Sequence, residues 1–260
     1  MIFGRGIVET PQDFGSQGAL PTHPQLLDWL AVSFVESGWD VRALLKTMVT
    51  SATYRQSSIA SQEHLERDPD NRFLARGPSN RLPAEMIRDN ALAASGLLTL
   101  KVGGESVKPY QPKGLWIEKT GPGNSYQHDS GENLYRRSLY TYIRRTTPHP
   151  AMIAFDAPNR SGCVVKRELT NTPLQALVLL NDPQFVEAAR VLAQRIQLEG
   201  GNRPEDQIEY GFRRLCGRTP SSKEADLLNK QYEAALKRFS GDTAAVDAIL
   251  GIGESPFDPA

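Results

Sequence analysis

The chain lacks an excess of charge of either sign. Its 260 residues include 30 lysines and arginines and 30 aspartates and glutamates, so the formal net charge at pH 7 is zero. Proteins that bind nucleic acid through their overall electric field carry a basic surface and usually a net positive charge. We therefore predict no nucleic-acid partner, and any site for an anion must come from local clustering of basic residues.

Long apolar runs are also missing. No stretch approaches the roughly 20 apolar residues that a membrane-spanning helix requires, and no secretory signal opens the chain. Residues 1–6 begin in the middle of a pattern, and residues 253–260 stop without a closing element. We expect a fragment of a longer protein, truncated at both ends and without a transmembrane segment.

Cysteine is scarce, since Cys163 and Cys216 are the only two. We favour two free thiols, one in a loop and one at a helix end; a single disulfide in an oxidising compartment is the alternative. The sequence has no Cys-x-x-Cys-His string for a c-type haem and no Cys/His spacing typical of zinc. We predict no metal and no cofactor in this chain.

Apolar residues recur at three-to-four spacing, which predicts a mainly α fold with long Gly/Pro-rich loops and little or no sheet. We predict a single helical domain over residues 1–260. Its parts are a loop with a helical hairpin (1–58), a helix (81–98), a long loop (99–132), a central basic and aromatic segment with helices (133–200), and C-terminal helices (205–250).

Prolines and polar residues set several of the expected helix boundaries. Pro173 opens one helix and Pro183 interrupts it, so that a second helix follows. Ser221 and Glu224 have the spacing of a capping box. The helix after Pro183 is expected to bury one face, made of Phe185, Val186, Ala189, Leu192 and Ile196.

Charged residues near the start of the helix at 81–98 have a simple interpretation. Glu85, Arg88 and Asp89 follow one another at close helical spacing, and Arg81 precedes them. Paired carboxylates can perform acid–base chemistry, but basic neighbours on the same helix favour solvated ion pairs. We expect these residues to be exposed and structural.

The densest group of basic, aromatic and amide side chains lies between residues 133 and 185. A helix over residues 135–145 would place Arg137, Tyr140 and Arg144 on one face, as a fork for carboxylate, sulfate or phosphate; a strand also suits this composition. A structural role for the arginines is the alternative. The candidate ligand-binding residues are Trp116, Arg136, Arg137, Tyr140, Arg144, Arg145, Arg160, Lys166, Arg167, Asn171 and Gln175.

Two further features belong to the loop at 99–132. Trp116 either binds a sugar ring or peptide, or fixes the loop to the core. His128 and Asp129 are an adjacent histidine and carboxylate within this loop. Together with Tyr140 they are the candidate catalytic residues of a hydrolase or lyase that acts on polysaccharide.

Several strings resemble one known family. They are FGRGIVETPQDFGSQGALPTHPQLLDWLA, SATYRQSS, NRLPAEMIRDNALAASGLL, VKPYQPKGLW, YRRSLYTYIRRT, FDAPNR and TNTPLQALVLLNDPQFVEAAR. The chain resembles planctomycete-specific domain one, a C-terminal domain of unknown function in large planctomycete proteins that often carry a cytochrome c domain upstream.

The resemblance covers nearly the whole chain and sets the functional expectations. It implies an extracytoplasmic protein, periplasmic or secreted, whose partners are its own upstream domains. Haem c would belong to an upstream domain and is not expected in this chain. We therefore expect an uncharacterised ligand-binding or docking module, with an anionic glycan as a candidate partner; the alternative is the hydrolase or lyase.

Overall fold

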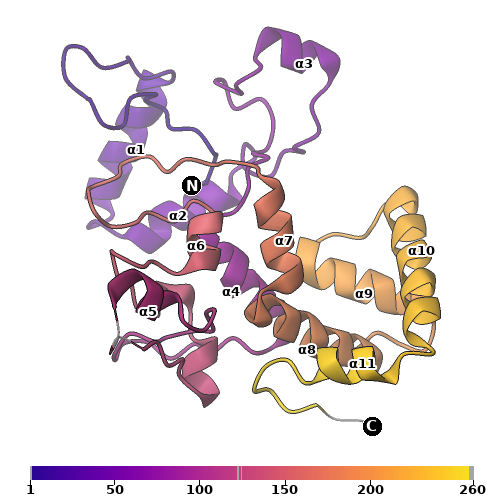
Figure 1. Cartoon of the computed structure of the whole chain (residues 1–260). Coiled ribbons are helices and arrows are strands. Elements are labelled where there is room, and N and C mark those ends of the chain that lie inside the picture. Colours follow the sequence, from indigo (N-terminus) through magenta and orange to yellow (C-terminus); the bar gives the residue numbers. More distant parts are fainter. Residues whose placement is uncertain (1, 122, 124, 258–260) are drawn as a thin grey trace. The chain divides into compact units, whose positions relative to one another are not determined.

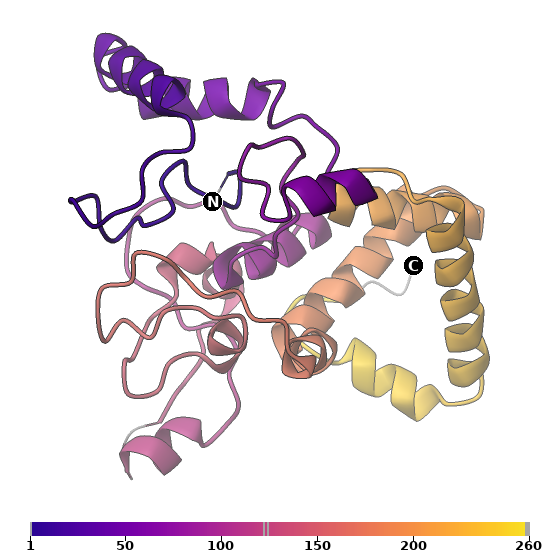
Figure 2. The same ribbon diagram turned by 90° about the horizontal axis from the view of Figure 1, so that it is seen from above.

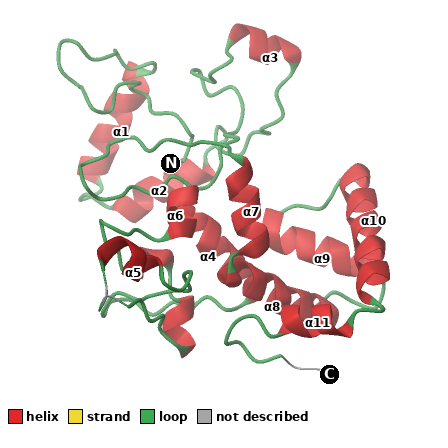
Figure 3. Ribbon diagram, in the orientation of Figure 1, coloured by secondary structure: helices red, strands yellow, loops and turns green. Residues whose placement is uncertain are grey.

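A computed structural model of the chain describes residues 2–121, 123 and 125–257. Every named element in these ranges is helical, which confirms the mainly α prediction (Figure 3). Pairing of extended backbone among the described residues is limited to two isolated bridges, Thr99 with Arg136 and Val107 with Thr141. The described helices include none with both the length and the apolar character to span a bilayer.

The chain divides into two compact units, residues 1–81 with 164–166 and residues 82–163 with 167–260. The first unit contains α1 (Pro24–Glu36), α2 (Val41–Thr50) and α3 (Gln62–Arg67) (Figure 1). The second contains α4 (Ala84–Ser95), α5 (Leu115–Thr120), η1 (Gly131–Tyr135), η2 (Ser138–Tyr140), α6 (Pro150–Ala154), α7 (Pro173–Asn181), α8 (Pro183–Glu199), α9 (Pro204–Cys216), α10 (Ser222–Phe239) and α11 (Thr243–Leu250). The expectation of a single domain stays a prediction.

A short turn joins α1 to α2 in the first unit. The backbone amides of Gly38 and Trp39 close α1 by donating to the carbonyls of Val35 and Phe34, each at 3.0 Å. Asp40 then caps α2, because its carboxylate accepts from the amides of Arg42 and Ala43. Both helices form where the sequence predicts them, yet none of their residues is buried.

The core of the second unit forms where α4 packs against α8. α4 contributes to two apolar clusters. The first consists of Ala84, Met152, Phe155 and Phe185. The second consists of Leu92, Tyr110, Leu134 and Tyr135. The loop after α4 and the segment around η1 are therefore part of the core and not a covering added to it.

The C-terminal helices close on themselves within the second unit. α8 contacts α9, α9 contacts α10, α10 contacts α11, and α11 returns to α8 (Figure 2). The capping box predicted at the start of α10 is confirmed: Ser221 Oγ accepts from the amide of Glu224, and the Glu224 carboxylate accepts from the amide of Ser221. This local pairing fixes the first turn without help from the core.

Proline also ends and starts helices as predicted. Pro173 and Pro183 occupy the first turns of α7 and α8, and Asp182 between them ends one helix and caps the other. α4 is shorter than the predicted 81–98, because it begins after Pro83 and ends at Gly96, whose φ is +89°. Residues Arg81 and Leu98 thus lie outside the helix.

The buried face of α8 differs from the prediction. Phe185 and Leu192 are buried as expected, but Ala189 is exposed, and Glu187 and Arg190 are buried instead. Both polar side chains bind the backbone of Ser255: Glu187 Oε1 accepts from its amide at 2.7 Å, and Arg190 Nη2 donates to its carbonyl at 2.6 Å. The C-terminal segment that crosses α8 therefore decides which face of this helix is buried.

The central segment is neither the helix nor the strand that its composition suggests. Residues 131–140 contain two short 3₁₀ turns, η1 and η2. The prediction that Arg137, Tyr140 and Arg144 share one face of a helix is therefore wrong. The side chain of Arg88 explains the difference, because it donates to the carbonyls of Leu134 and Arg136 at 2.5 and 2.8 Å. A side chain from α4 thereby holds this backbone in an irregular path.

Two remaining predictions can be compared with the structure. The loop at 99–132 is not wholly irregular, since it contains α5 and the start of η1. Cys163 and Cys216 are free and exposed, and Cys216 is the last residue of α9, as the preferred interpretation stated.

Candidate functional site

Arg88 is a buried side chain of the second unit that is held by four hydrogen bonds. Only 4% of it is exposed, and besides the two carbonyls above it donates to Ser138 Oγ at 3.2 Å and Gln184 Oε1 at 2.9 Å. Burial lowers the pKa of Arg88 to about 10, so the guanidinium stays protonated at neutral pH. The prediction of a solvated Arg88 is wrong, because its helical spacing with carboxylates does not reveal the carbonyls that it meets.

The neighbouring carboxylates of α4 also bind distant residues. Glu85 pairs with Arg167 Nη1 at 2.6 Å, while Asp89 accepts from the amide of Ser138 at 2.7 Å and lies 3.7 Å from Arg137 Nε. Arg167 and Arg137 are therefore held by carboxylates of α4. The structural alternative is favoured for these two candidate residues.

Arg136 and Tyr140 lie together and organise the loop after α4. The Arg136 guanidinium is 3.9 Å from the centre of the Tyr140 ring and donates to the carbonyls of Glu105 and Gly103 at 2.8 and 2.5 Å. The Tyr140 hydroxyl accepts from the amide of Gly103 at 2.8 Å. The pair is used by the protein's own backbone, which again supports the structural alternative.

The other candidates of the basic loop are more scattered. Gln175 is buried and donates to the carbonyl of Thr170 at 3.1 Å, so it fixes the loop before α7. Arg145, Arg160 and Asn171 are exposed in the second unit. Lys166 is also exposed but belongs to the first unit. Among the described residues, no hydrogen bond or ion pair joins these four residues into one site.

A cluster of aromatic rings and cations lies on the surface of the second unit. We call Lys108, Trp116, Tyr126, Tyr142 and Arg144 the cation–aromatic surface. The Trp116 ring is 5.0 Å from the Tyr126 ring and 6.0 Å from the Tyr142 ring, measured between centroids. The Arg144 guanidinium lies 4.5 Å from the Trp116 centroid, and Lys108 Nζ lies 5.7 Å from the Tyr142 centroid.

Burial separates the roles within this surface. Trp116 is only 8% exposed, which favours fixing of the loop over direct stacking on a sugar, whereas Tyr142 is 41% exposed. Tyr126 donates to the carbonyl of Pro109 at 2.5 Å, and burial raises its pKa well above the ordinary value. Neither Arg144 nor Lys108 forms an ion pair within the part of the chain that the structure describes. Both cations thus lie against aromatic rings and not against carboxylates.

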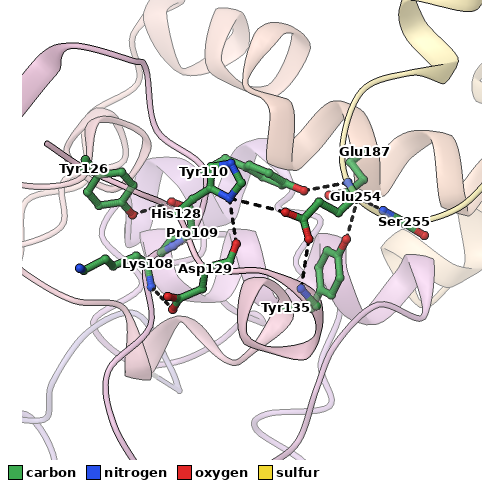
Figure 4. A network of polar contacts seen from close by, with 11 residues as sticks. Lys108, Pro109, Tyr110, Tyr126, His128, Asp129, Tyr135, Glu187, Glu254 and Ser255 are labelled. Carbon is green, nitrogen blue, oxygen red and sulfur yellow. Dashed lines mark hydrogen bonds and ion pairs between the residues drawn. The ribbon is translucent and has the colours of Figure 1, made fainter.

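The candidate catalytic residues do not form a dyad. His128 Nδ1 lies 2.8 Å from the backbone carbonyl of Asp129 and 3.7 Å from Glu254 Oε1 (Figure 4). The Asp129 carboxylate accepts from the amide of Lys108 at 2.8 Å instead. A general base is activated through a side-chain partner within hydrogen-bond reach, and this geometry does not supply one from Asp129.

The same network ties the C-terminal segment to the core. Tyr135 donates to Glu187 Oε1 at 2.7 Å, and the Tyr110 hydroxyl accepts from the amide of Glu254 at 2.9 Å (Figure 4). Burial raises the pKa of Tyr110 to about 12; burial, followed by the Glu187 carboxylate, also raises the pKa of Tyr135. Both phenols therefore keep their protons at neutral pH, and the network is structural.

A small cavity lies beside Arg88 and is lined by His149, Asp182 and Gln184 among others. Its volume is about 10 Å³, the size of one water molecule and too small for a substrate. His149 Nε2 bonds to the carbonyl of Tyr110 at 2.7 Å, and burial lowers the pKa of His149 to about 4. The imidazole is neutral at pH 7 and is a weak base there.

A more open hollow of about 440 Å³ lies along α9. Of its charged side chains, Arg213 pairs with Glu209 at 3.7 Å and Asp206 pairs with Arg203 at 2.6 Å, while Arg214 lies 5.6 Å from the centroid of the Tyr210 ring. No group of three or more metal-ligating side chains occurs in residues 2–121, 123 and 125–257. The cation–aromatic surface is therefore the arrangement most suited to a ligand.

These observations define a helical domain whose buried polar residues bind its own loops, with a small surface of positioned cations. The chain belongs to the family PSD1, a protein of unknown function (DUF1553), which matches residues 1–232. No curated protein and no solved structure matches it. The family resemblance seen in the sequence is confirmed, while the planctomycete source and the cytochrome c context stay predictions.

Sequence reasoning found Trp116 and Arg144 but missed their neighbours. Lys108 and Tyr142 stand 34 positions apart in a loop and in the central segment, and no local pattern links them. Lys108 lies beside Tyr142 because Val107 exchanges backbone hydrogen bonds with Tyr140 and Tyr142, at 2.8 and 2.7 Å. This pairing of two irregular segments has no sequence signature of its own.

Proposed function

We propose that this PSD1 domain is a binding module that holds acidic polysaccharide on the cation–aromatic surface. The observation that carries the proposal is that Arg144 and Lys108 lie against aromatic rings without a carboxylate partner among the described residues. Most other arginines of the central segment are bound by backbone carbonyls or carboxylates.

The chemistry of the surface suits carboxylate or sulfate groups. A guanidinium stacked on a ring keeps its N–H edge free, and that edge can donate two parallel hydrogen bonds to one oxyanion. The exposed Tyr142 ring beside Lys108 offers an apolar face for the sugar itself. The positive charges of Arg144 and Lys108 and the exposed ring of Tyr142 together favour an acidic sugar as the ligand.

Catalysis is not part of this proposal. The Asp129 carboxylate is occupied by a backbone amide, and His128 faces a backbone carbonyl and Glu254. Hydrolase or lyase activity at His128, Asp129 and Tyr140 stays a prediction of the sequence. It would be tested by replacing His128 with alanine and measuring turnover of polysaccharide.

The proposal is tested by the melting temperature of the purified chain with polygalacturonate, heparin or neutral dextran. A ligand that binds only the folded state raises the melting temperature by mass action. We expect a rise with an acidic polymer, no rise with dextran, and a smaller rise in high salt, because exposed charges are screened beyond about 10 Å at 0.1 M salt.

Variants connect the effect to the surface. Lys108→Ala with Arg144→Ala should remove the rise, and Arg144→Lys should retain part of it because the charge remains while the planar fork is lost. Lys230→Ala is the matched control, since Lys230 is exposed on α10 and outside the surface. An equal rise in the double variant and the control would refute the site.

Location and partners extend the proposal. We propose an extracytoplasmic domain that works beside an upstream cytochrome c domain, which rests on the family resemblance alone. Cell fractionation of the full protein in its native host tests the location, and a haem stain of the same band tests the cytochrome. Recovery of the protein in the cytoplasm without haem would reject both parts.

A further inference from the structure

Helix α1 is apolar on two opposite faces. Leu30 and Phe34 face inward and are half-buried. On the other side Trp29, Val32 and Val35 recur at spacing of three and are 55%, 55% and 52% exposed. A helix that is hydrophobic all round is normally buried on all sides. The outer face of α1 therefore has the composition of a covered surface.

Helix α2 presents a second exposed apolar stripe. Val41, Leu45 and Val49 follow one another at spacing of four, which places them on one face, and they are 55%, 45% and 41% exposed. Leu44 and Met48 occupy the half-buried side. On α2 the exposed stripe lies directly beside the half-buried side, whereas on α1 the two apolar faces are opposite each other. Both helices thus carry an exposed apolar stripe.

The charges beside these stripes are separated by sign. Asp28 and Glu36 are the only charged residues of α1, and both lie near its outer apolar stripe at helical spacing. Arg42 and Lys46 are the only charged residues of α2, and both lie next to its exposed stripe. None of the four forms an ion pair within the described residues.

We propose that a second copy of this chain covers the hairpin, with α1 of each copy packed on α2 of the other. A two-fold symmetric interface uses the same patch twice, so a contact of α1 with the partner's α2 is repeated by α2 with the partner's α1. The symmetry therefore requires that α1 be complementary to α2. The acidic, apolar α1 and the basic, apolar α2 meet this requirement. The two stripes become one core, and its rim carries opposite charges on each side.

Charge is what selects a second copy over another occupant. An uncharged apolar partner would cover the stripes but leave two acids and two bases at the rim without partners. A copy of the same hairpin supplies both signs on helices of suitable composition, and like charges meet only if α1 faces α1. The hairpin is thus complementary to itself in one arrangement and repulsive in the other.

The test is the mass of the full chain in solution, measured by sedimentation equilibrium over a range of concentrations. We expect a reversible dimer. Asp28→Lys with Glu36→Lys should weaken it at least about tenfold, and so should Arg42→Glu with Lys46→Glu, because attraction at the rim becomes repulsion. Mixing the two charge-reversed variants should restore a dimer that contains one copy of each.

The matched control is Asp226→Lys with Glu233→Lys on α10, where both residues are exposed and the change in charge equals that of the Asp28→Lys, Glu36→Lys variant. This control should leave the dimer unchanged. Helicity measured by circular dichroism keeps loss of fold apart from loss of association, since all substituted positions are exposed. A monomer at all concentrations, a dimer that survives both reversals, or variants that fail to pair when mixed would each overturn the proposal.

Discussion

The second unit of this protein buries charged side chains, whereas the first unit leaves large apolar side chains exposed. In the second unit Arg88 and Glu187 are 4% and 0% exposed, whereas in the first unit Trp29 and Val32 are each 55% exposed. The difference does not follow from hydrophobicity. Arg88 and Glu187 are buried because backbone groups of other segments of the second unit reach them. The α1–α2 hairpin stays exposed because no other described segment of the first unit covers its outer faces. In this chain a side chain is buried where another segment supplies a contact for it, whatever its hydrophobicity.

The largest effect on stability is expected from replacing the buried Arg88 of the second unit. Arg88→Met removes the donor of the Leu134 and Arg136 carbonyls, and we expect the free energy of unfolding to fall by about 3–5 kcal/mol. Urea denaturation measures this loss. Arg137→Met is the control, because Arg137 is half-exposed and its carboxylate partner lies 3.7 Å away, so about 0.5 kcal/mol is expected. Equal losses would mean that Arg88 does not hold η1 and η2.

Two leucines sharpen the contrast between the units. Leu92 is fully buried, so Leu92→Ala should destabilise the chain by about 2–5 kcal/mol. Leu45 on α2 is exposed, so Leu45→Ala should change the stability of the dilute chain by less than about 0.5 kcal/mol and weaken self-association instead. Thermal unfolding at low concentration separates the two effects. A large loss from Leu45→Ala in a dilute monomer would contradict the exposed state of α2.

The buried His149 of the second unit predicts that the stability of the folded chain depends on pH. The pKa of His149 is lowered from 6.5 to about 4 by burial, so between these values the unfolded chain binds more protons than the folded chain. Stability from this residue is complete above pH 6.5 and falls as the pH drops toward 4, by up to about 3 kcal/mol. His149→Gln should flatten this part of the profile.

Denaturation midpoints between pH 4 and pH 7 measure the effect. His64→Gln is the control, since His64 is exposed on α3, and its profile should follow that of the parent chain. If the stability of the parent chain instead increased as the pH fell from 7 to 4, His149 would not be buried as a neutral base.

The smallest expected effect compares two glycines of positive φ. A Cβ at Gly253 would overlap the carboxyl group of Glu187, whereas one at Gly38, in the turn between α1 and α2, would meet nothing within 4 Å. Gly253→Ala should cost about 1–3 kcal/mol and Gly38→Ala about 1 kcal/mol, the strain of the backbone alone. Chemical denaturation of both variants tests whether the C-terminal segment lies against α8.

Local signals in the sequence predicted most of the helices. The prolines before α7 and α8 and the capping box of α10 act within a few residues, so their effects can be read without a tertiary structure. The central segment could not be read in this way. Its 3₁₀ turns depend on Arg88, which is 46 positions from Leu134 in the chain.

The candidate site shows the same division. The sequence identified Trp116 and Arg144 by type. Arg136 and Arg167 carry the same guanidinium as Arg144, and Gln175 also has N–H donors, but all three are bound within the protein. Residue type shows that a side chain can bind an anion. Only the surrounding contacts show whether that capacity is already used.

The sequence by itself determined where α7, α8 and α10 begin, because caps and prolines act over one or two turns. It also indicated the family and favoured free thiols over a disulfide. The tertiary structure decided which faces are covered and which arginines stay unpaired. Those outcomes depend on segments far apart in the chain, such as Val107 beside Tyr142 and Ser255 across α8, whose meeting no local pattern encodes.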